Sequence, residues 1–342
     1  MTDKMQRIVL ASRPEAKPEA ANFRLEEAPM PRPGDGQVLL RTIWLSLDPY
    51  MRGRMSAAKS YSKPVEIGET MTAQVVAEVV ASKLDGYAPG DLVIAPIGWT
   101  SHGISDGTML EKITPGAAPL SAYLGVLGMP GTTAWVGLND VGGAQPGETV
   151  VVSAATGAVG SLVGQVAKLK GMRVIGVAGG PEKCAYAEKE LGYDVCLDHH
   201  ALDRKALTAA IAKAAPEGVH VYFENVGGKT LEAVLPNMRD FGRIALCGMI
   251  AWYSGIENAA PAPLVWGAIL RQRLRVEGFI IFDRWNRRPD FLKEVEPLVK
   301  AGKIHYRETI AEGLENAPAA FMELLEGGNF GKQLVRVGSD PK

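Results

Sequence analysis

Residues 154–160 place two glycines at a spacing that suits a phosphate group. The segment reads Ala-Ala-Thr-Gly-Ala-Val-Gly, so Gly157 and Gly160 follow an A-x-G-x-x-G pattern in which Ala155 replaces the usual first glycine. Gly157 would let the backbone approach a pyrophosphate, and Gly160 would let a helix pack closely on the preceding strand. The chemistry expected here is therefore dinucleotide binding. Glycines that serve only packing are the alternative.

The residues around this turn supply the elements that must position it. Thr149–Ser153 is a β-branched apolar run with the length of a buried parallel strand. Beyond the turn, apolar residues recur at three- and four-residue spacing, which predicts a helix that Gly171 ends. Arg173–Ala178 is a second strand-like run, so the region predicts a βαβ unit. The positive end of its helix would then face the diphosphate.

The residues after the second strand favour NADP(H) over NAD(H). An NAD-binding unit usually carries Asp or Glu about 20 residues after the glycine turn, where it holds the ribose 2′-hydroxyl. Here residues 177–180 are small and neutral, and the first carboxylate is Glu182, followed by Lys183. A lysine at a neutral opening suits a 2′-phosphate, which an aspartate would repel. The alternative is that Lys183 is a solvated helix residue.

Strand-like and helix-like segments alternate through the rest of this region. Strands are predicted at Val195–Asp198, Val219–Asn225, Arg243–Cys247 and Arg275–Phe282. Helices are predicted at Pro181–Leu191, Arg204–Ala214, Lys229–Arg239, Ala262–Arg273 and Asp290–Ala301. This alternation indicates an α/β class with a doubly wound, mostly parallel sheet. Ligands are then expected beyond the carboxyl ends of its strands, at residues 224–228, 248–254 and 279–282.

The N-terminal third has a different pattern. Short β-rich runs separated by Pro and Gly fill residues 1–120, which is typical of a compact, partly open β-barrel. Residues 303–337 contain a predicted helix and a final strand that should return to this barrel. We therefore expect two domains, 1–124 with 303–342 and 125–302. Arg52, Arg54 and Tyr61 should lie in a loop over one end of the barrel.

Composition limits the class of protein. The chain has 342 residues, a net charge of -1 and a sequence pI near 6.6, so a nucleic-acid or anionic-membrane surface is not expected. It shows no signal peptide and no run near 18 apolar residues, which predicts a soluble, cytoplasmic protein. The three cysteines form no C-x-x-C pair, which argues against a disulfide framework.

Several further segments carry a family resemblance. They are LSLDPYMRGRMS (45–56), LGVLGMPGTTAW (124–135), AATGAVGSLVGQVAKLKG (154–171), VAGGPEKC (177–184), YFENVGGK (222–229), GLENAPAAF (313–321) and GGNFGK (327–332). With these the chain resembles the zinc-free medium-chain dehydrogenase/reductases of the prostaglandin reductase (leukotriene B4 12-hydroxydehydrogenase) group, and most of all the bacterial NADPH-dependent curcumin reductases. The resemblance implies a GroES-like catalytic domain, a Rossmann domain that binds NADP(H), and a homodimer.

The resemblance also implies roles for matching positions. Met129 and Thr133 would line the nicotinamide side, and Lys183 would hold the 2′-phosphate. Residues that would meet the diphosphate or complete the pocket are Gly157, Ala158, Val159, Asn225, Cys247, Tyr253, Phe279 and Asn329. One position departs from the pattern, because His199 stands where the prostaglandin reductases have a tyrosine that helps hold the adenosine phosphate. A protonated histidine would do the same, so the affinity for NADPH should depend on pH near neutrality.

The residue types indicate a reaction without metal. Residues 1–120 contain no cysteine and one histidine, His102, so they cannot supply the Cys/His/Glu ligands of a catalytic zinc. Alcohol oxidation is difficult without a Lewis acid, whereas an activated C=C bond is easier to reduce. We therefore expect hydride transfer from NADPH to the β-carbon of an α,β-unsaturated ketone or aldehyde. Tyr253 would donate to the enolate, or would only pack on the cofactor; Tyr50 and Tyr61 would line the substrate mouth, or be structural.

Two other functions remain open from the sequence. One is an NADPH-dependent quinone oxidoreductase, which the zinc-free superfamily also includes. The other is a non-catalytic NADPH-binding sensor or structural protein. Fold alone cannot separate these from an enone reductase.

Overall fold

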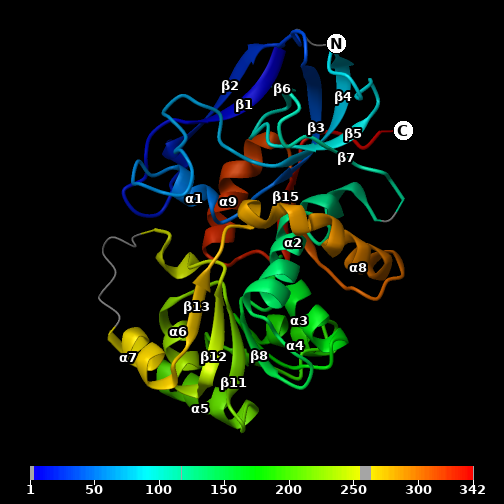
Figure 1. Cartoon of the computed structure of the whole chain (residues 1–342). Coiled ribbons are helices and arrows are strands. Elements are labelled where there is room, and N and C mark those ends of the chain that lie inside the picture. The colour runs from blue at the N-terminus through cyan, green and yellow to red at the C-terminus, as the bar shows by residue number, and fades with distance from the viewer. Residues whose placement is uncertain (1–3, 117, 255–262, 342) are drawn as a thin grey trace. The chain divides into compact units, whose positions relative to one another are not determined.

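The computed structural model describes residues 4–116, 118–254 and 263–341 (Figure 1). The chain divides into two compact units. One unit comprises Met1–Gly125 and Glu308–Lys342, and the other comprises Val126–Arg307. Within the described residues, no helix combines the length and apolarity that crossing a bilayer requires.

The first unit is built on a seven-stranded sheet with the order β14-β15-β3-β4-β5-β7, in which β6 also pairs with β3. Its strands are β3 (Val38–Ser46), β4 (Val75–Ser82), β5 (Leu92–Ala95), β6 (His102–Ser105), β7 (Glu111–Lys112), β14 (Glu308–Glu312) and β15 (Lys332–Arg336), and a separate pair is formed by β1 (Lys4–Leu10) and β2 (Phe23–Pro29). Its α-helices are α1 (Met51–Arg54) and α9 (Ala317–Leu325). The core contains Phe23 stacked on Trp99, with Phe321 edge-on to both rings.

The second unit is a six-stranded parallel sheet with the order β10-β9-β8-β11-β12-β13. The strands are β8 (Thr149–Ser153), β9 (Arg173–Ala178), β10 (Val195–Asp198), β11 (Val219–Glu224), β12 (Met238–Leu246) and β13 (Arg275–Gly278). The helices are α2 (Met129–Val136), α3 (Gly160–Leu169), α4 (Pro181–Lys189), α5 (Arg204–Ala214), α6 (Gly228–Val234), α7 (Pro263–Gln272) and α8 (Arg288–Lys300). In Figure 1, α3 and α4 lie on one side of the sheet, and α6 and α7 on the other. The predicted doubly wound sheet is confirmed.

The direction of strand order reverses between β8 and β11. Numbered by position in the unit, the order is third, second, first, fourth, fifth and sixth strand, which is the order of dinucleotide-binding sheets. Such sheets bind their ligands beyond the carboxyl ends of the strands at this reversal. The candidate site is therefore at the ends of β8, β9, β11 and β12.

Several predicted elements are wrong at their ends, among them the strand predicted over Arg243–Cys247, which the structure places at Met238–Leu246. The helix predicted over Lys229–Arg239 stops at Val234, because Pro236 cannot continue the hydrogen-bond ladder, and β12 already starts at Met238. The strand predicted over Arg275–Phe282 stops at Gly278, which pairs with the last residue of β12. The partner strand β12 ends at the same point, at Leu246, and residues 281–287 form a 3₁₀ helix.

Candidate cofactor and active site

The glycine turn between β8 and α3 is shaped by close backbone contacts. Ala154 has a positive φ of 51°, and its carbonyl accepts the amide of Gly157 at 2.9 Å. A Cβ on Gly160 would lie 2.3 Å from the same carbonyl oxygen, so only glycine fits there. Ala158 and Val159 are half-exposed residues whose amides, within the described part of the chain, donate to no protein acceptor. Unsatisfied amides at a helix N-terminus suit a diphosphate.

Tyr193 supports this turn from the protein interior, and sequence reasoning missed it. Its buried hydroxyl donates to the Gly160 carbonyl at 2.7 Å, and burial raises its pKa well above the ordinary value. Two glycines make room for the ring, because a Cβ on Gly164 would lie 2.2 Å from it and one on Gly176 would lie 3.0 Å from it. A glycine inside a helix and another inside a strand were the available signals of this close packing.

The carboxyl ends of β9 and β10 meet at the predicted 2′-phosphate position. The Asp198 carboxylate accepts the amide of Gly180 at 2.8 Å, which joins the β10 end to the start of α4. Lys183 lies half-buried in the first turn of that helix. A Cβ on Gly179 would lie 3.2 Å from Nε2 of His199, so the imidazole lies against the β9–α4 turn. The structure thus brings Lys183 and His199 to one end of the sheet.

This end of the sheet concentrates positive charge. Lys229 donates to the His199 carbonyl at 2.5 Å, which adds a third basic side chain that sequence reasoning had not assigned. Burial lowers the pKa of Lys183. Burial, and then the neighbouring His200 and Lys229, lower the pKa of His199. Since the lowered pKa values mean that the charged forms of Lys183 and His199 are disfavoured, a dianionic phosphate would stabilise them, and the residues present fit the 2′-phosphate of NADPH.

A hydrogen-bond network joins β8 to β11 where the strand order reverses. The Ser153 hydroxyl donates to the buried carboxyl of Glu224 at 2.9 Å and accepts the amide of Asn225 at 2.8 Å. The Asn225 side chain donates to the Ser153 carbonyl at 2.8 Å, and the Val226 amide donates to Glu224 at 2.6 Å. Burial raises the pKa of Glu224. Asn225 was predicted as a cofactor residue, whereas Ser153 and Glu224, which hold it, were not.

Cys247 and Tyr253 follow the carboxyl end of β12. Burial raises the pKa of Cys247 to about 12, so this thiol stays protonated. The Tyr253 hydroxyl accepts the Met249 amide at 3.3 Å and would lie 3.0 Å from a Cβ on Gly248. Tyr253 therefore lies over the strand end, with a half-buried side chain.

The predicted nicotinamide-side residues, Met129 and Thr133, lie in α2, and Phe279, which was predicted to complete the cofactor pocket, follows β13. The Thr133 hydroxyl donates to the Met129 carbonyl at 2.8 Å, one helical turn earlier. Phe279 lies edge-on to Phe223, with 6.5 Å between ring centroids. Gly137, which directly follows α2, must be glycine, because a Cβ at this position would lie 2.7 Å from the Phe279 ring.

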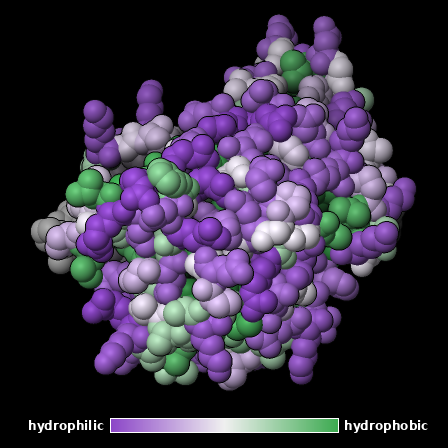
Figure 2. Space-filling view, turned by 60° about the horizontal axis from the view of Figure 1, so that its bottom comes forward, coloured by the Kyte–Doolittle hydropathy of each residue, from purple (hydrophilic) through white to green (hydrophobic). Residues whose placement is uncertain are grey.

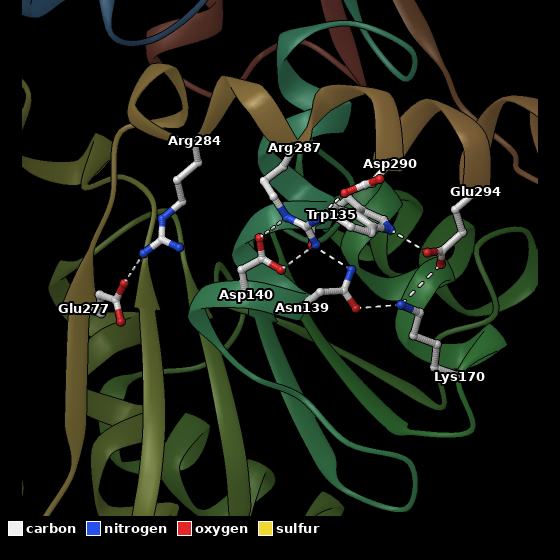
Figure 3. A network of polar contacts seen from close by, with 9 residues as sticks. All are labelled: Trp135, Asn139, Asp140, Lys170, Glu277, Arg284, Arg287, Asp290 and Glu294. Carbon is white, nitrogen blue, oxygen red and sulfur yellow. Dashed lines mark hydrogen bonds and ion pairs between the residues drawn. The ribbon is translucent and has the colours of Figure 1, made fainter.

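A cavity of about 460 Å³ opens beside Phe279. Its lining residues are Asp140, Gly278, Phe279, Ile280, Asp283, Arg284, Asn286 and Arg287. Figure 3 shows that its arginines are held by acids: Arg284 pairs with Glu277 at 2.6 Å, and Arg287 pairs with Asp140 at 2.8 Å. The neutralised rim gives this cavity no strong preference for an anion.

In the first unit, Arg54 brings the two predicted substrate tyrosines together. Its guanidinium carbon lies 4.3 Å from the ring centroid of Tyr61 and 5.5 Å from that of Tyr50. Tyr61 is 57% exposed, whereas burial, and then the charge of Asp48, raise the pKa of Tyr50. The prediction of a loop is wrong for Arg52 and Arg54, which lie buried in helix α1. Burial is possible because Arg52 donates to the Ala16 carbonyl and the rings of Tyr50 and Tyr61 cover Arg54.

Asn329, the remaining predicted cofactor residue, lies before β15 in the first unit. Its side chain is buried and donates to the Gly331 carbonyl at 2.8 Å. Nearby, the buried ammonium of Lys332 pairs with Asp48 at 2.9 Å and donates to the Leu47 carbonyl at 2.6 Å. Every other predicted cofactor residue lies in the second unit.

Two protein families match the chain. Residues 6–113 match the family described as the N-terminal domain of oxidoreductase, and residues 158–297 match the family described as zinc-binding dehydrogenase. Within the residues that the structure describes, no group of three or more His, Cys, Asp or Glu side chains is placed to hold a metal ion.

Similarity to individual proteins runs end to end. The NADPH-dependent curcumin reductase of Escherichia coli is 51% identical over 339 residues, which cover 98% of this chain and 97% of that protein. Prostaglandin reductase 1 of Bos taurus is 44% identical over 93% of this chain and 95% of its own. The crystal structure of CurA from Vibrio vulnificus in complex with NADPH has a TM-score of 0.92 and 47% identity, over 98% of this chain and all of that one (100%).

Proposed function

Since this chain belongs to the medium-chain dehydrogenase/reductase family, we propose that it is an NADPH-dependent reductase of the C=C bond of α,β-unsaturated ketones and aldehydes. The observation that carries the proposal is the set of strand ends in the second unit. There a glycine turn presents two amides that donate to no described protein acceptor, and the half-buried side chains of Lys183 and His199 follow the carboxyl ends of β9 and β10.

Binding and orientation of the cofactor fall to the residues of this unit. The amides of Ala158 and Val159 would hold the diphosphate, and Lys183 and His199 would hold the 2′-phosphate. Charge-assisted hydrogen bonds of this kind are shorter and stronger than neutral ones. Asn225, fixed by Ser153, would keep the adjoining loop in place.

NADPH, when bound, supplies the hydride that reduces the double bond. The chain's own part in the chemistry is a proton donor and a shielded position for the substrate. Tyr253 would donate its hydroxyl hydrogen bond to the enolate oxygen, because it lies over the end of β12, at the edge where ligands bind. Phe279, Cys247 and Thr133 would exclude water beside it.

The pair of Tyr50 and Tyr61, bridged by Arg54, supports apolar substrates with an aromatic or phenolic part. An exposed ring held over a guanidinium offers a flat apolar face with little rotamer freedom. We assign this pair to the substrate side.

The test is NADPH consumption with curcumin, a medium-chain 2-alkenal, an aryl enone, a quinone, and a secondary alcohol with NADP⁺, each with and without a chelator. We expect chelator-insensitive turnover of the enones and the alkenal, with products saturated at the double bond. Turnover of the quinone alone would assign the protein to the quinone oxidoreductases. NADPH binding without any turnover would mean a non-catalytic binding protein.

We also propose a homodimer formed along β13, the exposed edge of the six-stranded sheet. Neighbouring α7 exposes Trp266 by 72% and Leu270 by 79%, and Val276 is exposed on the edge strand itself. Figure 2 shows hydrophobic residues in small separate groups on a largely hydrophilic face. An unpaired strand edge with apolar neighbours favours pairing with a second copy. Sedimentation of a monomer at micromolar concentration would contradict this.

The cytoplasm is the proposed location. All three cysteines, Cys184, Cys196 and Cys247, are free thiols. Free thiols are typical of a reducing compartment.

A further inference from the structure

Two of the free thiols lie in contact beside the proposed 2′-phosphate position. Cys184 is in the first turns of α4 and Cys196 is in β10, and 3.2 Å separates their sulfur atoms. Strand β10 pairs with β9, which leads into α4, so the sheet itself brings together residues that are 12 positions apart. Cys184 retains 8% of its exposed surface and Cys196 retains 9%. A small oxidant therefore has limited access to both.

The two thiols differ in acidity. The pKa of Cys184 is lowered by the hydrogen bond from Cys196, and also by a backbone amide at Ala178. The same contact raises the pKa of Cys196, which keeps its proton. Cys184 is therefore the thiol that ionises more readily, and a more acidic thiol in contact with a protonated one is the arrangement of a reactive cysteine with its resolving partner.

We infer that Cys184 and Cys196 are a redox modification site, at which a hydroperoxide forms a reversible disulfide that weakens the binding of NADPH. The effect on the cofactor rests on the proposed function, because it requires that Lys183 and His199 hold the 2′-phosphate.

The reaction balances with the peroxide as oxidant. The Cys184 thiolate attacks one peroxide oxygen, the O–O bond breaks, and Cys184 becomes a sulfenic acid while hydroxide, or the corresponding alkoxide, leaves. The Cys196 thiol then attacks the Cys184 sulfur, the S–S bond forms, and the sulfenic oxygen leaves with the thiol proton as water. Two thiols are oxidised to one disulfide. Hydrogen peroxide is reduced to two molecules of water, and an organic hydroperoxide is reduced to water and an alcohol. An external dithiol restores the pair by thiol–disulfide exchange.

The position of the pair connects it to the cofactor. Lys183 precedes Cys184, and β10 leads from Cys196 to His199. A disulfide would shorten the sulfur separation from 3.2 Å to about 2.05 Å, and so displace one element against the other by roughly 1 Å. The turn between them has little room, since a Cβ on Gly179 would already lie 2.8 Å from the His200 ring. Charge-assisted hydrogen bonds to phosphate tolerate such a displacement poorly.

The experiment compares the reduced, peroxide-treated and dithiothreitol-restored full-length protein. Alkylation followed by peptide mass spectrometry shows whether Cys184 and Cys196 are linked, and it separates them from Cys247. Equilibrium titrations then give the dissociation constants of NADPH and NADH. We expect the linked form to bind NADPH about tenfold more weakly, with NADH affinity unchanged, because NADH has no 2′-phosphate. Dithiothreitol should restore the reduced values.

Cys196→Ser is the matched control, since it keeps size and polarity and removes the resolving thiol. Because it cannot form the disulfide, its NADPH affinity should not fall after the same peroxide treatment, and Cys184→Ala provides a second variant if Cys196→Ser folds poorly. Failure to link the two cysteines would overturn the inference, as would a disulfide that leaves the ratio of the two dissociation constants unchanged. If the reduced protein does not prefer NADPH to NADH, it is the proposed cofactor function that fails, while the peptide mapping still decides whether the site is modified.

Discussion

The Ser153 hydroxyl donates to the buried carboxyl of Glu224 over 2.9 Å, and this contact joins the ends of β8 and β11 at the reversal of strand order. Ser153 also binds Asn225 twice, because its hydroxyl accepts a hydrogen bond from the Asn225 backbone amide and its carbonyl accepts one from the Asn225 side chain. The strand ends that carry the glycine turn and the Asn225 loop are therefore held together by side chains that touch no predicted ligand.

Glu224 should make the stability of the protein depend on pH. Burial raises its pKa in the folded state, so the stabilisation is complete below the unfolded value of 4.5 and is lost as pH rises through the folded value. Glu224→Gln retains an acceptor for Ser153 and cannot ionise. We expect the free energy of unfolding of Glu224→Gln, measured in urea, to increase relative to that of wild type as pH rises above 4.5. A constant difference between the two proteins would mean that Glu224 does not titrate in this range.

Lys183→Ala should weaken NADPH binding selectively. Loss of one charge-assisted hydrogen bond costs about 1.5–3 kcal/mol, which corresponds to roughly a 10- to 150-fold higher dissociation constant. NADH binding should not change. Lys189→Ala, in the last turn of the same helix and exposed, is the matched control. If NADPH and NADH weaken equally in Lys183→Ala, the lysine does not contact the 2′-phosphate.

His199 should give NADPH affinity a pH dependence. Burial lowers its pKa in the free protein, so the imidazole is neutral at pH 7, and a bound phosphate would raise that pKa. A ligand that prefers the protonated form binds more tightly as pH falls. We therefore expect the NADPH dissociation constant to decrease from pH 8 to 6 and to be flatter in His199→Gln. A flat wild-type profile would show that His199 does not titrate against the phosphate.

Tyr253→Phe tests the proton donor. Removing one hydrogen bond to a developing oxyanion typically lowers kcat by about 100-fold. We expect that decrease with an unchanged NADPH dissociation constant, as measured by steady-state kinetics and titration. Full turnover in the variant would limit Tyr253 to packing.

Gly164→Ala should destabilise the second unit. The added Cβ would lie 2.2 Å from the Tyr193 ring, and overpacking of a core costs about 1–3 kcal/mol. Gly53→Ala is the control, because no atom other than its chain neighbours and its own helix backbone lies within 4 Å of the added Cβ. Urea unfolding that is equal for both variants would contradict the close packing of Tyr193 under the glycine turn.

Much of the second unit is encoded locally. The predicted strands Thr149–Ser153, Arg173–Ala178 and Val195–Asp198 agree with β8, β9 and β10 at both ends. Their β-branched runs and the glycines between them act within a few residues, so the pattern alone determines them. The position of Lys183 shortly after β9 follows from the same local order.

Other features depend on contacts between distant segments, which the sequence pattern does not contain. The end of β13 is set by the end of its neighbour β12, and the role of Tyr193 is set by two glycines on other elements. The sequence does not predict that Cys184 and Cys196 lie together, because no short motif contains both. Only the pairing of β10 with β9 brings Cys196 to Cys184, since parallel strands place their equivalent ends at one edge of the sheet. The sequence by itself determined the βαβ unit and its preference for a phosphorylated dinucleotide, and the tertiary structure decided which side chains hold that unit in place.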